Sequence, residues 1–175
     1  MKLSEWHWSY SIDGKHVIIQ QPSNSGSHYY NYKGNNSIIL LAVFGPDYQC
    51  LWMSAGTNGG LPDSAIWQNC DLKKALSSCQ NTLNLPKSRP LPGRAMPVPY
   101  VLTGDNPFSL TRFLMKPFPH YRLSRMQRIS ENCFGIIAKR WRVFHAPILL
   151  PPDTVINLIL VALVLHNFLR YSVGL

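Results

Sequence analysis

The first half of the chain shows the alternation of apolar and polar residues that is typical of β-strands. Residues 8–12 and 16–20 carry aromatic and β-branched side chains on either side of Asp13 and Gly14. They are expected to form either one interrupted strand or two adjacent strands. Residues 21–36 are rich in Pro, Ser, Asn and Gly, which predicts a loop.

A hairpin is predicted after this loop. Residues 37–44 and 49–55 are apolar runs, and the turn sequence Gly-Pro-Asp-Tyr separates them at positions 45–48. A turn of this kind between two apolar runs predicts antiparallel pairing. We therefore expect three or four strands before the first helix.

The apolar spacing becomes helical at residue 63. Residues 63–77 predict one helix, with Asp63 or Ser64 as its N-cap. The expected buried face comprises Ile66, Trp67, Cys70 and Leu76. Residues 78–99 contain five prolines, so a long surface loop is expected there, followed by a short strand at residues 100–103.

Three helices are predicted in the remainder of the chain. A short one is expected at residues 109–115, and a long amphipathic one at residues 122–144, where Ser124 is placed to cap it. The apolar stripe of the long helix comprises Ile129, Cys133, Phe134, Ile137 and Trp141. The apolar run at residues 154–169 is shorter than the roughly 20 residues that a bilayer needs. Polar residues interrupt it, so a buried C-terminal helix capped by Asp153 is expected.

This order of elements predicts an α/β fold. The first three strands would be antiparallel, and a crossover helix would lead to the fourth. Such a topology places the end of the first strand beside the end of the fourth.

Composition favours a globular domain with a polyanionic partner. The chain has 175 residues, of which 46% are hydrophobic and 14% charged, which suits one domain and excludes a disordered tail. The net charge is +9, and eight of the 17 Lys and Arg residues fall within residues 112–142. Clustered cations favour nucleic acid, because binding releases counterions. A solvated basic face without a partner explains the charge nearly as well.

The cysteines and the N-terminus indicate which cellular compartment the protein occupies. Cys50, Cys70, Cys79 and Cys133 show no Cys-x-x-Cys spacing, so neither a zinc site nor a disulfide framework is predicted. A reducing compartment fits best. The first ten residues lack the apolar region of a signal peptide, so secretion is not expected.

Only eight residues are acidic, which limits the candidates for acid-base or metal chemistry. Asp13 and Asp105 each follow a predicted strand and stand beside a glycine, which lets backbone or ligand approach closely. Glu131 is an isolated acid among the cations of the predicted basic helix. If the two strands are neighbours, the two aspartates converge at one sheet edge, and a helix packed across that edge brings in Glu131.

Two interpretations of these carboxylates stay open. Three carboxylates are the hard oxygen ligands that Mg²⁺ prefers, and a two-metal site would activate a nucleophile against a phosphodiester. Alternatively, Asp13 and Gly14 form a turn and Asp105 caps the helix after it. Glu131 would then pair with Arg128. From the residues alone, this second interpretation is favoured.

The chain also resembles a known family, block by block. The blocks are IDGKH (12–16), YYNYKG (29–34), NGGLPDSAIW (58–67), LTGDNPFSL (102–110), FLMKPFP (113–119), YRLSRMQRISENCFGIIAKRWRVF (121–144) and LVLHNFLR (163–170). In this order they resemble the PIF/Harbinger transposase superfamily and the Harbinger transposase-derived nucleases. The resemblance covers nearly the whole chain.

The resemblance implies a ribonuclease H-like mixed sheet, three antiparallel strands plus a parallel strand, flanked by helices. Residues 1–175 would form a single DDE endonuclease domain that cleaves DNA phosphodiester bonds with a divalent cation, Mg²⁺ or Mn²⁺. Asp13, Asp105 and Glu131 would be the catalytic triad, and the same three with Asp63 would bind metal. An N-cap role for Asp63 is compatible with this. The DNA-binding residues would be Arg122, Arg125, Arg128, Lys139, Arg140 and Arg142.

The remaining blocks are assigned supporting roles. His16 and the tyrosines of YYNYKG are expected to support the site rather than to react. His166 and Asn167 are expected to pack in the core.

Three departures from the family pattern bear on activity. Family proteins carry a helix-turn-helix-like region before the first aspartate, whereas twelve residues precede Asp13, so this chain is expected to lack that region. Asp105 and Glu131 are only 26 positions apart, and a shortened connection would misplace Glu131. Asn106 and Pro107 replace the acidic or small residue that usually follows the second aspartate.

Functions from different classes follow from these observations. The first is a metal-dependent DNA endonuclease or strand-transferase derived from a transposase. The alternative is a catalytically impaired, domesticated or truncated remnant that binds DNA or a protein. A ribonuclease H-like enzyme acting on RNA is a third option. DNA is the expected partner, with a separate DNA-binding protein as a second partner and no membrane. The expected location is the nucleus, with the cytoplasm second.

Overall fold

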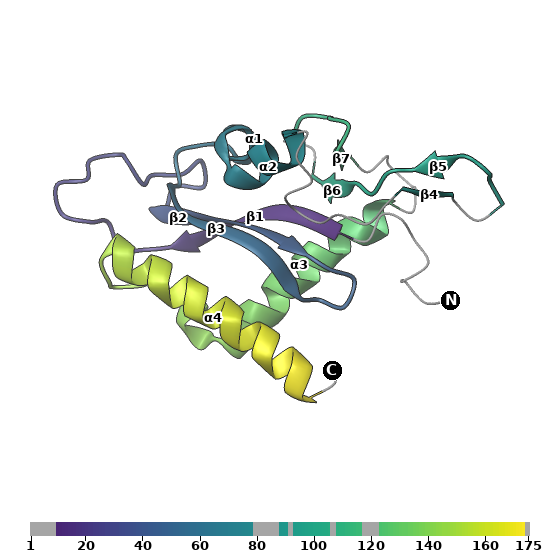
Figure 1. Ribbon diagram of the computed structural model, residues 1–175. Coiled ribbons are helices and arrows are strands. Elements are labelled where there is room, and N and C mark those ends of the chain that lie inside the picture. The colour runs from purple at the N-terminus through teal and green to yellow at the C-terminus, as the bar shows by residue number, and fades with distance from the viewer. Residues whose placement is uncertain (1–9, 79–87, 91–92, 106–107, 117–122, 174–175) are drawn as a thin grey trace.

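The fold is described from a computed structural model for residues 10–78, 88–90, 93–105, 108–116 and 123–173 (Figure 1). β1 (Tyr10–Ile18), β2 (Ser37–Phe44) and β3 (Cys50–Asn58) are antiparallel neighbours. β6 (Leu102–Gly104) pairs in parallel with β1, and β7 (Leu114–Met115) pairs in parallel with β6. The sheet order is β3-β2-β1-β6-β7. The predicted α/β, ribonuclease H-like fold class is therefore confirmed.

β1 is one continuous strand, which decides between the two arrangements expected for its sequence. Asp13 and Gly14 lie inside it, opposite Ala42 and Leu41 of β2. The interpretation of Asp13 and Gly14 as a turn is therefore wrong. The β-branched residues on both sides of the pair continue the same ladder with β2, and this pairing overrides the turn preference of Asp-Gly.

β7 replaces the short helix that was predicted at residues 109–115. Leu114 is fully buried in the core and pairs with Leu102 of β6. Thr111 and Leu114 exchange backbone hydrogen bonds of 3.0 and 3.3 Å, which closes a tight turn before the strand. Burial of Leu114 at the sheet edge outweighs the helical spacing of this segment. Because residues 108–116, the described residues that follow Asp105, form no helix, the predicted capping role of Asp105 is also wrong.

The proline-rich segment contains some regular structure. β4 (Arg89–Pro90) and β5 (Pro97–Val98) form a separate two-stranded antiparallel ribbon. The prediction of an irregular loop is therefore wrong at these residues. Residues 79–87 and 91–92, including Cys79, lie outside the described part of the chain.

The region predicted as one helix at residues 63–77 is two helices, α1 (Asp63–Asn69) and α2 (Asp71–Ser77). Cys70 breaks them apart, because its backbone is extended at φ −72° and ψ 150°. Its Sγ accepts a hydrogen bond from the backbone N of Lys73 and so caps α2. Pro62 is the N-cap of α1, so the predicted N-cap role of Asp63 or Ser64 is wrong.

Helices cover both faces of the sheet. Figure 1 shows α1 and α2 on one face, and α3 (Leu123–Arg140) and α4 (Pro152–Val173) on the other. β2 lies between these layers and is buried at all eight positions. On the α3 and α4 side the core includes Phe44 and Phe134, whose rings meet edge to face at 5.0 Å. On the other side Trp67 is the largest buried side chain.

α3 confirms the predicted apolar stripe but has different ends. Ile129, Cys133, Phe134 and Ile137 are buried. The helix begins at Leu123, so Ser124 lies inside it and does not cap it. It ends at Arg140, because the backbone of Trp141 is extended, and a 3₁₀ turn (Arg142–His145) follows.

α4 packs one face against the sheet. Its buried residues are Val155, Ile159, Ala162, Leu163 and His166. His166 Nε2 lies 2.8 Å from the Tyr48 carbonyl oxygen, and the Asn167 side chain accepts a hydrogen bond from the Cys50 backbone N and donates one to its carbonyl oxygen. The expected core packing is therefore confirmed for His166, whereas Asn167 is half-buried and binds the backbone of β3. Asp153 is the second residue of the helix and not its cap.

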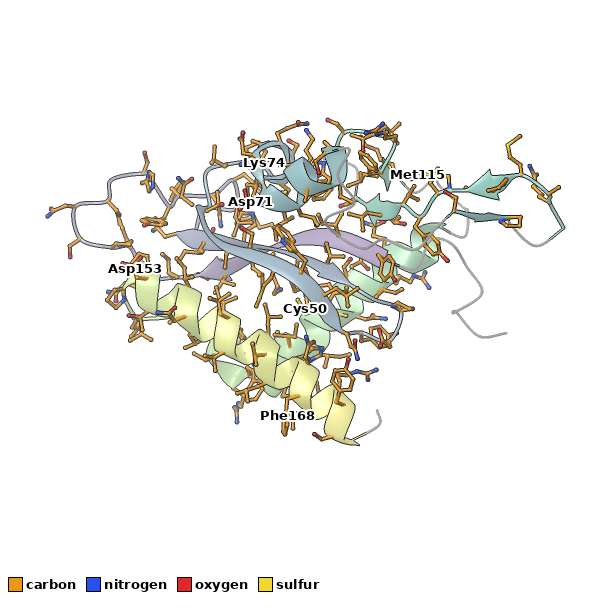
Figure 2. The ribbon with its side chains drawn as sticks, viewed as in Figure 1. Cys50, Asp71, Lys74, Met115, Asp153 and Phe168 are labelled. Atoms are coloured by element: carbon orange, nitrogen blue, oxygen red, sulfur yellow. The ribbon has the colours of Figure 1, made fainter. Side chains whose placement is uncertain are left out.

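The outer face of α4 is apolar and exposed, which corrects the expectation of a fully buried helix. Figure 2 shows Phe168 pointing away from the sheet, and its side chain is 63% exposed. Its exposed apolar neighbours on the helix are Val161, Val164, Leu165 and Tyr171. Residues Pro152–Ser172 are long and apolar enough to cross a membrane by length and composition, and 28% of that window is buried. A core helix that packs one side on a sheet passes the same test.

Packing of α4 predicts that two leucines of this helix contribute unequally to the free energy of unfolding. Leu163 is 1% exposed and Leu165 is 41% exposed. Leu163→Ala should lower the free energy of unfolding by about 2 to 5 kcal/mol, because it leaves a cavity against the sheet. Leu165→Ala is the matched control and should cost less than about 1 kcal/mol. Urea unfolding measures both, and equal losses would contradict the packing of α4.

Candidate active site

The register between β1 and β6 determines where two predicted site residues lie. Ile12 is paired with Gly104 on the neighbouring parallel strand. Asp13 and Asp105 are the next residues on these strands, so they emerge beside each other where β6 ends. A Cβ on Gly104 would lie only 3.1 to 3.3 Å from side-chain atoms of Phe108, Ile12 and Leu114, so the lack of a side chain permits this close pairing.

Asp63 lies directly over Gly14. A Cβ on Gly14 would lie 2.5 to 2.6 Å from the carboxyl atoms of Asp63, closer than real Cβ contacts allow. The lack of a side chain at Gly14 therefore leaves room for the Asp63 carboxyl group. Asp63 is also the first residue of α1, where a negative charge is favourable.

Glu131 comes from the opposite layer. Side chains alternate along a strand, so Asp13 shares the face of Ser11, which α3 covers. A buried hydrogen bond of 3.0 Å joins the Oγ atoms of Ser11 and Ser130, the residue before Glu131. This bond fixes α3 on β1 close to Asp13. Glu131 itself is exposed.

The alternative pairing of Glu131 with Arg128 is not formed. The one salt bridge among the described residues joins Lys74 to Asp71 on the outer side of α2 (Figure 2). Among the described residues of α3, therefore, no cation forms a salt bridge with Glu131.

The four carboxylates form one electrostatic cluster. Burial, together with the charges of Asp63, Asp105 and Glu131, raises the pKa of Asp13 to about 7. The hydrogen bond from the Gly14 backbone N to Asp13 Oδ1, 2.8 Å long, opposes this. Burial also raises the pKa of Asp63, with Asp105 adding to the effect. Of the three carboxylates that act on Asp13, Glu131 has the smallest effect.

His16 lies beside the cluster and is held by polar contacts. Its Nδ1 is 2.8 Å from Ser37 Oγ, which also accepts a hydrogen bond of 2.8 Å from Asn31 Nδ2. Burial lowers the pKa of His16, whereas the charge of Asp63 raises it. His16 is thus next to the acidic cluster.

The predicted DNA-binding cations differ in exposure. Arg128, Lys139 and Arg142 are exposed on α3 and the 3₁₀ turn. Arg140 is half-buried, and its Nη1 atom is buried. Its positive charge lowers the pKa of His166 on α4. Its side chain therefore faces the contact between the two helices. Arg122 and the side chain of Arg125 lie outside the described part.

The donor set suits a divalent cation. Carboxylate oxygens are the hard ligands that Mg²⁺ and Mn²⁺ take, and a cation bound there would offset the burial and the acidic charges that raise the pKa of Asp13. In the described ranges, however, no three His, Cys, Asp or Glu side chains are close enough to hold one ion. Ligation thus requires the carboxylates to converge further. Residues 106–107 and 117–122 of the connection to Glu131 lie outside the described part.

Comparison with known proteins identifies the family. Residues 12–167 match the sequence profile described as DDE superfamily endonuclease. The chain belongs to this family. The DDE superfamily endonuclease assignment confirms the recognition made from the sequence blocks, and it implies a nuclease or transposase-derived function. Members of this superfamily generally use divalent metals.

One curated relative of this DDE superfamily endonuclease is the protein ALP1-like of Arabidopsis thaliana. The two sequences are 25% identical over 173 residues, which covers 91% of this chain and 42% of the relative. The chain thus spans less than half the length of this relative. No solved structure matches the chain.

Ser11 and Ser130 were not predicted from the sequence. Ser130 is a polar residue within the apolar stripe of α3, next to Ile129. A polar residue at such a position needs a partner when it is buried, and this was the available signal. Its partner on β1 is 119 positions away and could not be deduced from spacing.

The pKa of Asp13 predicts a pH-dependent effect of Asp13→Asn in the presence of EDTA. The unfolded carboxyl group titrates near 3.8 and the folded one near 7, so the ionised group destabilises the folded state increasingly as pH rises between these values. The substitution should leave stability nearly unchanged at pH 4 and raise it by at most about 4 kcal/mol at pH 8.

Urea unfolding at both pH values measures this difference. Asp153→Asn is the control, because Asp153 is exposed in the first turn of α4. Its loss should slightly lower stability at pH 8, through the helix dipole. A gain from Asp13→Asn that does not change with pH would contradict the electrostatic cluster.

Proposed function

We propose that this DDE superfamily endonuclease is a metal-dependent DNA nuclease of Harbinger transposase descent, with residues 1–175 as a single domain. Asp13, Asp105 and Glu131 are the acidic triad, and Asp63 is a fourth metal ligand. The observation that carries the proposal is the group of acids around the partly buried Asp13, where burial and then repulsion from the neighbouring acids raise the pKa of that residue to about 7. A divalent cation relieves this repulsion.

Each residue has a distinct position in the proposed site. Asp13 and Asp105 come from adjacent parallel strands, so the backbone fixes their spacing. Asp63 extends from α1 over Gly14, and Glu131 is carried by α3 on the other face of the sheet. When bound, Mg²⁺ or Mn²⁺ supplies an activated nucleophile and stabilises the leaving oxygen of the phosphodiester.

DNA is the proposed substrate and partner. Arg128, Lys139 and Arg142 are exposed on the same layer as Glu131 and supply contacts to the phosphate backbone. A separate DNA-binding protein provides target recognition. The nucleus is the proposed location, and no membrane is involved, since α4 packs its inner face on the sheet.

A second candidate function is a catalytically impaired remnant that binds DNA or a protein. Three observations favour it. Glu131 is exposed, and no three potential ligands in the described part approach closely enough to hold one ion. The short connection of 26 positions between Asp105 and Glu131 limits how far Glu131 can move towards the aspartates.

Plasmid nicking separates these two candidates. The wild type should convert supercoiled DNA to the nicked form with Mg²⁺ or Mn²⁺, and EDTA should abolish the reaction. Asp105→Asn and Glu131→Gln should each reduce the rate by at least about 100-fold, as expected for the loss of a catalytic group. Asp153→Asn, on the exposed start of α4, is the control and should retain the rate.

The same assay can also contradict the nuclease proposal. If the wild type and Asp105→Asn are both inactive across Mg²⁺ and Mn²⁺, the nuclease proposal is wrong. Salt-sensitive DNA binding that survives Asp105→Asn would then support the remnant.

A further inference from the structure

The loop between β1 and β2 presents an exposed ring beside the acidic cluster. Tyr32 is 82% exposed, although a tyrosine ring carries a large apolar surface. Its ring meets the His16 ring edge to face, with the centroids 5.7 Å apart and the planes at 71°. Lys33 Nζ lies 5.4 Å from the centroid of the Tyr32 ring. One side of the loop therefore combines an aromatic face with a cation.

The backbone on both sides of Tyr32 is held in place by Asn31. Asn31 is 3% exposed, and its Oδ1 accepts hydrogen bonds from the backbone N of Lys33 and of Asn35, at 2.9 and 3.1 Å. Its own backbone N donates to the Asn35 carbonyl oxygen at 2.8 Å. Gly34 closes the turn with φ +77°. Tyr32 is thus exposed on a loop whose shape is determined by a buried side chain.

The same loop is electrostatically coupled to the proposed metal ligands. The positive charge of Lys33 lowers the pKa of both Asp63 and His16, so Lys33 lies near both groups. The charge of His16 likewise lowers the pKa of Asp63. Gly14 and His16 are two residues apart on β1 and share a face of the sheet, so the Tyr32 ring, which contacts His16, lies on the same face as Asp63 over Gly14.

A single exposed tyrosine is common on protein surfaces and needs no explanation by itself. Three features distinguish Tyr32: the buried Asn31 that shapes its loop, the cation beside its ring, and its place next to the carboxylates. Together they match the sites that bind unpaired nucleotides, where an aromatic face stacks on a base and a cation contacts the adjacent phosphate.

We propose that Tyr32 is a stacking platform for an unpaired nucleobase of the DNA substrate, with Lys33 binding the phosphate next to that base. The inference rests on the proposed function and names its substrate class: DNA with an unpaired or extruded nucleotide close to the bond that is cut. Bases inside a duplex have both faces covered by their neighbours, so away from duplex ends only an unpaired base can stack on the ring.

Binding without cleavage tests the platform separately from the nuclease. All variants are made in the Asp105→Asn background and studied in EDTA, so that no DNA is cut. The probes are a blunt duplex and the same duplex with a single-stranded extension that contains 2-aminopurine. Fluorescence anisotropy gives the affinity, and quenching of 2-aminopurine reports stacking.

Tyr32→Ala should weaken binding to the extended DNA by roughly 5- to 150-fold, the range for the loss of one stacked base. Affinity for the blunt duplex should change by less than about twofold, and 2-aminopurine should lose its quenching. Tyr32→Phe keeps the ring and should retain both affinity and quenching. Lys33→Ala should reduce the slope of log affinity against log salt by about 0.7, the value for one phosphate contact to a single strand.

Tyr30→Ala is the matched control, because it removes an exposed ring, 54% accessible, from the same loop. It should leave the affinity for both probes unchanged. The proposal is overturned if Tyr32→Ala weakens the two probes equally, if it behaves like Tyr30→Ala, or if the wild type does not quench 2-aminopurine. Failure of plasmid nicking would overturn the nuclease and leave this binding result intact.

Discussion

The parallel pairing of β1 with β6 is the contact on which the acidic site depends. It places Ile12 beside Gly104, so that Asp13 and Asp105 leave adjacent strands at the same level of the sheet. A slip of one residue would turn the side chain of Asp13 to the other face. Tight packing around Gly104 opposes such a slip. Gly104 has no side chain, so β1, β7 and Phe108 pack directly against it, and another residue in its place would crowd them.

The two helical layers contribute one acid each to this sheet edge. Gly14 leaves room for Asp63 on one face, and the buried Ser11–Ser130 hydrogen bond holds α3 on the other. The result is a concentration of negative charge in a protein whose net charge is +9. Partial burial makes this arrangement costly for Asp13, which explains why its proton is retained to a pH far above the usual range for an aspartate.

Sequence patterns predicted the central part of the fold and failed where tertiary contacts override local preference. The apolar runs of β2 and the stripe of α3 were predicted well, because burial dictates their composition. β7 was missed, since the pairing of Leu114 with β6 is a tertiary contact that local spacing does not reveal. The position of Asp63 over Gly14 depends on a contact between elements, and no spacing rule reveals it. Asp13, Asp105 and Glu131 were singled out by their positions beside glycines or among cations, the family resemblance assigned them as a triad, and their catalytic role stays a prediction.

The order of contacts along the chain bears on how the site assembles. β1, β2, β3 and α1 are consecutive elements within residues 10–69, and each strand pairs with the next. The pairing of Ile12 with Gly104, by contrast, closes a long loop and carries a larger entropic cost. We expect Asp63 to take its place over Gly14 before β6 docks, so the sheet edge that carries Asp105 is a late product of folding. Pulse-labelled hydrogen exchange would resolve that order strand by strand.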